Sequence, residues 1–222
     1  CKYLYHRFIK LMKKLFIKLI KLLGYEVIDQ NRFSSPTLNK RLNEDLSIFN
    51  KKSIILPLGE VKISRKVNSL LIILRINTEV EIWDQNKKRL FEQPKIEYSI
   101  RSLNSLLKSI KFCKKKYTNL KIKTILIDDN STEKNLIKIR NLIKDENIEI
   151  LQLDHQKFKS EIKEQKNKET YSNLASLKQS FEIGKDQGED LVFFVEDDYL
   201  HFETMLEEMI SSFQRISSQL EK

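Results

Sequence analysis

Short apolar segments that alternate with helix-forming segments constrain the fold of this chain more than any other feature. The apolar runs have strand length and occupy 69–77, 121–129, 148–154 and 190–198. Apolar residues at helical spacing mark 97–113, 135–144, 172–188 and a segment from about 202. This alternation implies parallel crossover connections, and near-continuous apolar strands imply a sheet covered on both faces. We therefore predict an α/β fold with a Rossmann-like open, mostly parallel sheet over 67–222.

The first 24 residues predict a basic amphipathic helix. Residues 1–23 hold seven of the 41 basic residues and none of the 31 acidic ones. Apolar pairs recur at helical spacing, and the helix should stop at Gly24; the pairs are Phe8/Ile9, Leu11/Met12, Leu15/Phe16, Leu19/Ile20 and Leu22/Leu23. An apolar face opposite a cationic face suits an anionic membrane surface. The alternative is a helix packed on the protein's own core.

The remaining charges narrow the class of partner. With residues 1–23 set aside, 34 basic residues face 31 acidic ones, so the net charge of +10 resides mainly in the terminal helix. A nucleic-acid binder spreads basic charge over its folded surface, and we expect no nucleic-acid partner. No uninterrupted apolar run reaches the ~18–20 residues that span a bilayer. Two cysteines, Cys1 and Cys113, form no disulfide framework and fit a reducing compartment.

We therefore expect a cytoplasmic protein that is peripheral at the inner membrane surface. Residues 25–66 are interpreted as a connector with a short strand near 53–56. Because the first residue is Cys1 instead of a methionine, the true start of the chain is expected to lie further upstream.

Polar side chains lie at the carboxyl end of every predicted strand. In an open parallel sheet, ligands bind beyond the carboxyl ends of the strands, so these residues are the candidate site. They are Arg75, Asn77, Thr78 and Glu79 at the end of the first strand, Asp128, Asp129, Asn130 and Ser131 at the end of the second, Asp154 at the end of the third, and Glu196, Asp197 and Asp198 at the end of the fourth.

The acids Glu196, Asp197 and Asp198 are the sharpest of these features. Three adjacent carboxylates repel one another unless a cation or hydrogen-bond donors neutralise them. Their oxygens suit Mg²⁺ or Mn²⁺. Because alternate residues of a strand point to opposite faces, Glu196 and Asp198 should point to one face of the sheet and Asp197 to the other. The alternative is a solvated strand end that caps the next helix.

The segment from Asp128 to Ser131 has two interpretations. Its carboxylates could accept hydrogen bonds from a nucleotide base or a ribose hydroxyl. Equally, Asp, Asn and Ser are the residues that turn a strand into a helix and cap that helix from Glu133 onward.

Two motifs together resemble a known family. ILIDDNST (125–132) resembles the DDGS or DDNS turn of family 2 glycosyltransferases, and FFVEDDYLH (193–201) resembles the DxD element of GT-A enzymes in its EDD form. The resemblance covers about 69–215. It implies the nucleotide-sugar-binding half of a GT-A glycosyltransferase. Such an enzyme moves a sugar from a nucleoside-diphosphate sugar, with UDP-sugars favoured, to a glycan or lipid-linked acceptor.

The same resemblance implies roles for individual residues. Asp198 resembles the direct ligand of Mn²⁺ or Mg²⁺. Glu196 and Asp197 resemble the acids that face the ribose and the metal-bound water. Asp129, beside Asp128, resembles the acid that contacts the base. The first nucleotide-contacting loop would supply Arg75, Asn77 and Glu79, and the positions of Asn173 and Lys178 resemble donor contacts.

The chain departs from the family in two respects. The first strand ends in Arg-Ile-Asn-Thr instead of Pro-Thr-Tyr-Asn, and the sequence ends 24 residues after Asp198. The family places its acceptor site and catalytic base further on. We therefore expect the domain at 67–222 to be incomplete at its C-terminus, and we assign no catalytic base.

Two other functions remain open. A nucleotidyltransferase would carry a glycine-rich loop after the first strand, whereas RINTEVEIWD contains no glycine. A non-catalytic, membrane-associated binding module is compatible with the length of the chain.

His201, three residues after Asp198, could approach a metal ion, although such a histidine is more often an ordinary surface residue.

Overall fold

The computed structural model describes residues 2–25, 27, 49–55, 59–79, 93–163 and 168–221. The chain divides into two compact units, of which the larger is Val67–Glu208. The smaller unit is formed by residues on both sides of that segment.

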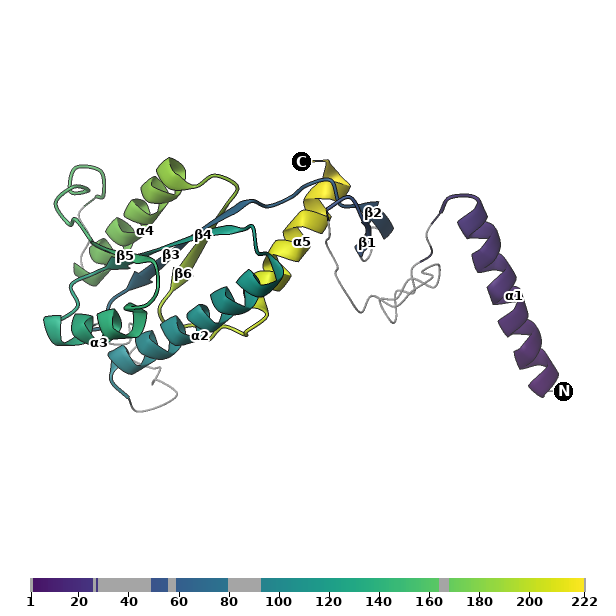
Figure 1. Ribbon diagram of the computed structural model, residues 1–222, viewed down its shortest axis with the longest axis horizontal. Coiled ribbons are helices and arrows are strands. Elements are labelled where there is room, and N and C mark those ends of the chain that lie inside the picture. Colours follow the sequence, from purple (N-terminus) through teal and green to yellow (C-terminus); the bar gives the residue numbers. More distant parts are fainter. Residues whose placement is uncertain are drawn as a thin grey trace. The chain divides into compact units, whose positions relative to one another are not determined.

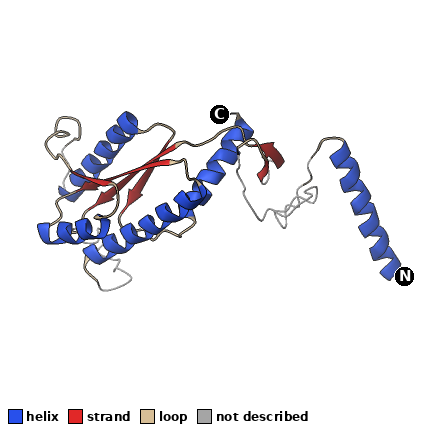
Figure 2. Cartoon of the chain, in the orientation of Figure 1, coloured by secondary structure: helices blue, strands red, loops and turns tan. Residues whose placement is uncertain are grey.

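The larger unit contains a four-stranded sheet in which all strands are parallel (Figures 1 and 2). Its strands are β3 (Ser69–Ile76), β4 (Lys121–Asp128), β5 (Ile148–Gln152) and β6 (Leu191–Glu196). Their order across the sheet is β5-β4-β3-β6. The predicted Rossmann-like α/β fold is confirmed, and each predicted strand forms within two residues of its expected bounds at either end.

The helices cover both faces of this sheet. Helices α2 (Lys95–Lys116) and α3 (Glu133–Ile143) lie on one face, and α4 (Lys168–Gln187) lies on the other (Figure 1). The chain moves outward from β3 through β4 to β5 and then returns to place β6 on the far side of β3. The strand order therefore reverses between β3 and β6. At such a reversal, neighbouring connections leave on opposite faces and open a crevice at the carboxyl ends of the strands.

Buried aliphatic side chains of the two central strands form the core on the α4 face. Leu71, Ile73, Ile125 and Ile127 pack there with Ala175 of α4. Alternation along the strands sends these residues to one face and their neighbours, such as Ile72 and Leu126, to the other, and both sets are buried. The sheet is thus covered on both sides, as its apolar strands predicted.

The segment after β5 contributes to the same core. From sequence, 155–170 is interpreted as a loop. In the structure Phe158 is fully buried in the core and Ile162 packs against it. No helix or strand is assigned within 155–163, so the loop is confirmed there, and one aromatic side chain among many polar ones anchors it to the core. Helix α4 begins within the predicted loop, at Lys168.

Two glycines allow the end of α4 to lie close to β6. A Cβ on Gly184 would meet the Phe194 ring at 2.9 Å, and a Cβ on Gly188 would meet Val192 at 2.4 Å and the Gly184 carbonyl oxygen at 2.5 Å. Any larger residue at 188 would therefore force the helix end away from the strand.

The smaller unit contains helix α1 (Lys2–Leu22) and a hairpin of β1 (Lys52–Ile55) and β2 (Gly59–Lys62). Helix α1 was predicted, and β1 matches the short strand expected near 53–56. The sequence GEVK of β2 is too short and polar to signal a strand by itself, and it forms because β1 supplies the antiparallel partner. Helix α5 (Met205–Leu220) begins in the larger unit and ends in the smaller one.

We predict that Phe158→Ala lowers the free energy of unfolding by about 3–5 kcal/mol, because it leaves a cavity in the core. Phe202→Ala is the matched control, since that ring is 84% exposed, and it should change stability by less than about 0.5 kcal/mol. Urea unfolding followed by circular dichroism measures both. Equal stability of the two variants would contradict the burial of Phe158.

Candidate functional site

Asn77 joins the ends of three strands at the point where the strand order reverses. It directly follows β3, and its side-chain amide donates a hydrogen bond to Asp129 Oδ2 at 3.2 Å. Its backbone N–H donates to Asp197 Oδ2 at 3.3 Å. One residue thus connects the acid that follows β4 to the acid that follows β6. The prediction that strand-end carboxylates meet at one edge of the sheet holds for this pair.

Asp197 is buried and is neutralised by the chain itself. The Lys95 ammonium lies 2.6 Å from Asp197 Oδ1, and the Ser99 hydroxyl donates to Oδ2. Both partners come from the first two turns of α2. Only 7% of Asp197 is exposed, so removal of its counter-charge would leave a carboxylate without solvent. The middle acid of the triplet therefore fastens β6 to α2.

Glu196 is held on the opposite face of the sheet. It forms an ion pair with Arg75, the neighbouring residue of β3. The same guanidinium donates to Asn173 Oδ1 at 2.8 Å and to the Ser176 hydroxyl at 3.0 Å, both in α4. The predicted alternation is therefore seen, since Glu196 is directed to the α4 side and Asp197 to the α2 side.

Asp129 is the second buried carboxylate of the site. The Ser172 hydroxyl lies 2.7 and 2.6 Å from its two oxygens, and His155 Nε2 lies 3.1 Å from Oδ1. The next residue, Asn130, has a φ of 61° and turns the chain toward α3, a left-handed conformation that asparagine tolerates. Asp129 is thus oriented by donors from β3, α4 and the segment after β5.

Glu79 contacts residues at the start of α3. Its carboxylate accepts hydrogen bonds from the Thr132 hydroxyl at 3.0 Å and the Asn135 amide at 2.8 Å. The hydrogen bond from Thr132 is the main cause of a lowered pKa for Glu79. Acids are favourable at helix N-termini, so these contacts account for Glu79 without a ligand.

Asp128 differs from its neighbour Asp129. It is fully buried, and neither of its carboxylate oxygens has a hydrogen-bond partner among the described residues. The strand register places it on the face opposite Asp129. Asp128 is therefore not part of the Asn77 cluster.

Asp198 is the exposed member of the acid triplet. Within the described part of the chain, its carboxylate has no hydrogen bond or ion pair, and no group of three or more His, Cys, Asp or Glu side chains is placed to hold a metal ion. The described residues thus contain no preformed metal cage. What they offer is one free carboxylate beside two that protein cations already neutralise.

Several residues of the cluster were not found from sequence. These are Lys95 and Ser99 of α2, Ser172 and Ser176 of α4, and His155. Their signal is weak, because single serines and lysines near a helix start are common. Asn173 accepts a hydrogen bond from Arg75 at its Oδ1, and its expected contact with the donor stays a prediction. Lys178 instead pairs with Glu161 and lies over the Phe158 ring, away from the strand ends.

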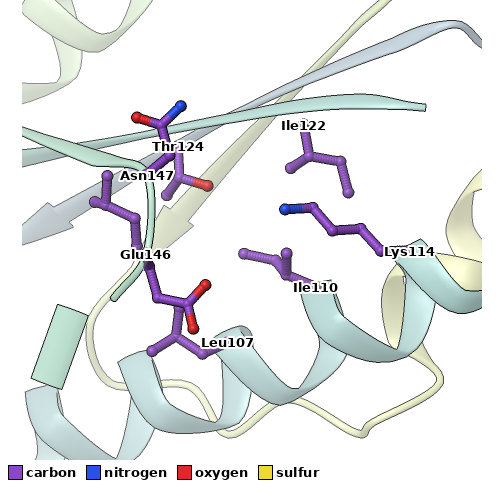
Figure 3. Close-up of a pocket in the computed structure, with 8 residues that line it drawn as sticks. Leu107, Ile110, Lys114, Ile122, Thr124, Glu146 and Asn147 are labelled. Atoms are coloured by element: carbon purple, nitrogen blue, oxygen red, sulfur yellow. The ribbon is translucent and has the colours of Figure 1, made fainter. Parts of the chain in front are cut away.

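A separate hollow lies at the amino ends of the strands (Figure 3). It is lined by Leu107, Ile110 and Lys114 of α2, Ile122 and Thr124 of β4, and Glu146, Asn147 and Ile148 at the start of β5. In an open parallel sheet this is the edge opposite the ligand-binding edge. The hollow and the candidate site are therefore distinct.

Comparison with known proteins identifies no relative. No protein-family model matches the sequence, and neither curated proteins nor solved structures give a match to it.

His201 follows the acid triplet but is partly enclosed. Its Nε2 is buried without a partner among the described residues, and its ring meets Phe193 edge-on with centroids 6.5 Å apart. Burial disfavours the charged imidazolium and lowers the pKa of His201 below 6.5.

This burial predicts a pH dependence of stability. Between the two pKa values the unfolded chain binds a proton at His201 that the folded chain does not, so stability should fall as pH drops below about 6.5 and level off below the folded pKa. His201→Gln should remove this contribution to the pH dependence of stability. Urea titrations of both proteins from neutral to acidic pH measure the difference, and identical slopes would contradict the prediction.

The acid triplet yields a second prediction. Asp197→Asn leaves Lys95 buried without its counter-charge and should cost about 3 kcal/mol of stability. Asp198→Asn, one residue away but exposed, should change stability by less than about 0.5 kcal/mol. Thermal and urea unfolding of the two variants provide the measurement. A larger loss in the Asp198 variant would overturn the assignment of these two acids.

Proposed function

We propose that this chain is the donor-binding part of a glycosyltransferase. It would move a sugar from a nucleoside-diphosphate sugar, most favourably a UDP-sugar, to a hydroxyl of a glycan or lipid-linked acceptor. The observation that carries the proposal is the bridge from Asn77 to Asp129 and Asp197 at the reversal of strand order. Open α/β sheets bind nucleotides at that point, and the DDNS and EDD motifs meet there.

Asp129 is suited to recognise the nucleoside. A carboxylate accepts hydrogen bonds from the N–H of a base or from a ribose hydroxyl. Ser172 and Asn77 hold both oxygens of Asp129 in place. A fixed acceptor loses little entropy when a ligand binds. Asn77, Asp129 and Ser172 would therefore form the nucleoside end of the site.

The diphosphate would lie between the first turns of α2 and α4. Helix N-termini carry partial positive charge and bind phosphate groups. Lys95 of α2 and Arg75, which is held against α4, lie on either side of the strand ends, each paired with an acid of the triplet. Two helix starts suit a dianionic group better than a neutral sugar.

A divalent ion would be held by Asp198 together with the diphosphate. Mg²⁺ and Mn²⁺ accept one or two protein carboxylates plus substrate phosphates, and Asp198 is the acid of the triplet that no described cation neutralises. Such an ion supplies Lewis-acid stabilisation of the departing diphosphate. Glu196 and Asp197, already paired with Arg75 and Lys95, would lie near the ion without direct ligation.

The reaction forms one bond and breaks another at the anomeric carbon. The acceptor oxygen attacks that carbon, the bond to the diphosphate oxygen breaks, and its electron pair leaves with the nucleoside diphosphate. The acceptor proton passes to a general base, a role that none of the described residues is assigned. Arg75 and Lys95 would orient the leaving group throughout.

One observation favours a second candidate, a binding module without catalysis. Arg75 and Lys95 already neutralise two of the three acids, so the triplet is stable without a metal ion. A module of this kind would bind a nucleotide or a nucleotide-sugar and release it unchanged.

Calorimetric titration with UDP tests the proposal. In the presence of Mn²⁺ we expect binding by the intact chain and at least about tenfold weaker binding by Asp198→Ala, because one ligand of the ion is lost. Asp145→Ala removes an equally exposed acid that precedes β5 at the opposite edge of the sheet, and it should bind like the intact chain.

The outcomes separate the two candidates. Binding that depends on Asp198, with release of UDP from a UDP-sugar in the presence of an acceptor, supports the transferase. Binding without turnover supports the module. If neither UDP nor GDP binds in the presence of Mn²⁺, both candidates are refuted.

A further inference from the structure

Helix α1 presents a continuous apolar surface. From Leu11 onward its large apolar side chains are mostly exposed, with Leu15 at 55%, Phe16 at 56% and Leu22 at 84%. Its other exposed members are Leu11, Met12, Leu19 and Leu23. A contiguous exposed surface of this kind marks a site of interaction.

The opposite side of α1 is purely cationic. At 3.6 residues per turn, the seven exposed apolar residues occupy about 140° of the helix circumference. Lys13, Lys14, Lys18 and Lys21 occupy the far side and are all exposed. Ile17 is the one apolar residue among them and is only partly exposed. No acid interrupts the cationic side anywhere in residues 1–23.

We propose that α1 docks on an anionic lipid surface and lies along it. The apolar side would enter the boundary between headgroups and acyl chains, and the lysines would extend to the anionic headgroups. Charge complementarity selects this occupant, since a cationic side without acids matches phosphate headgroups. None of the described helices is long and apolar enough to cross a membrane, which agrees with a surface orientation.

A second copy of α1 fits the same surface less well. Helices that pair through an apolar seam place charged residues beside it, and opposite charges there stabilise the pair. Two copies of α1 would bring lysines together with no acid to offset them. The apolar surface is also broader than the narrow seam of a coiled coil.

Vesicle co-sedimentation of the full chain tests the proposal. We expect binding to mixed phosphatidylcholine and phosphatidylglycerol vesicles and much weaker binding to phosphatidylcholine alone. Leu15→Glu/Leu19→Glu should weaken binding at least about tenfold, because two apolar side chains no longer enter the lipid. Lys14→Glu/Lys18→Glu should weaken binding to a similar extent at low salt. High salt should reduce the difference in binding between this variant and the original chain.

Matched variants elsewhere in the chain serve as controls. Ile137→Glu changes an apolar side chain of α3 that is 50% exposed. Lys134→Glu/Lys144→Glu reverses the charge of two exposed lysines near the ends of α3. These variants should bind vesicles like the original chain, and circular dichroism should show that all variants keep their helical content.

Three results would overturn the proposal. The first is equal binding to anionic vesicles by the α1 variants and the control variants. The second is binding that does not depend on phosphatidylglycerol. The third is an absence of vesicle binding together with a dimer that Leu15→Glu/Leu19→Glu dissociates, which would assign the apolar surface to a second copy of this chain. None of these results depends on nucleotide binding, so the proposal stands or fails independently of the proposed enzymatic function.

Discussion

The end of β6 is held by two ion pairs that point in opposite directions, and the geometry of the strand-end site depends on them. Glu196, which is half exposed, and Asp197, which is buried, are adjacent carboxylates that repel each other. Arg75 neutralises the first on the α4 side, and Lys95 neutralises the second on the α2 side. Arg75 is hydrogen-bonded to α4 and Lys95 belongs to α2, so the two pairs fasten β6 to both helical layers.

These two ion pairs shape the chemistry available at the crevice. Two acids of the triplet are already paired, and among the described residues Asp198 is the acid without a cation partner. The site thus combines two ion pairs, helix N-termini and one exposed acid. That combination differs from a cage of acidic ligands, which would hold a metal ion by itself. It suits a ligand that brings its own negative charge and completes the coordination of an ion, as a diphosphate does. The buried and oriented Asp129 then supplies the selective contact.

Part of this site could be predicted because parallel strands end at one edge of a sheet. Asn77, Asp129, Glu196 and Asp197 were found in that way. Lys95 and Ser172 were missed, because they belong to helix starts whose approach to the strands depends on packing and not on local sequence. Glu79 was expected at the ligand, yet its hydrogen bonds go to Thr132 and Asn135 of the α3 N-terminus. A carboxylate beside a strand end has the same sequence signature whether it contacts a ligand or caps a helix.

The sequence by itself determined the alternation of strands and helices, the coverage of both sheet faces and the two-sided character of α1. These properties depend on residues that are neighbours along the chain, and their periodicity is visible without coordinates. Only the tertiary structure decided the strand order β5-β4-β3-β6, the burial of Phe158 and the pairing of each acid with its own cation. These properties depend on contacts between residues far apart in the chain, where many pairings are compatible with the same local pattern and packing selects one.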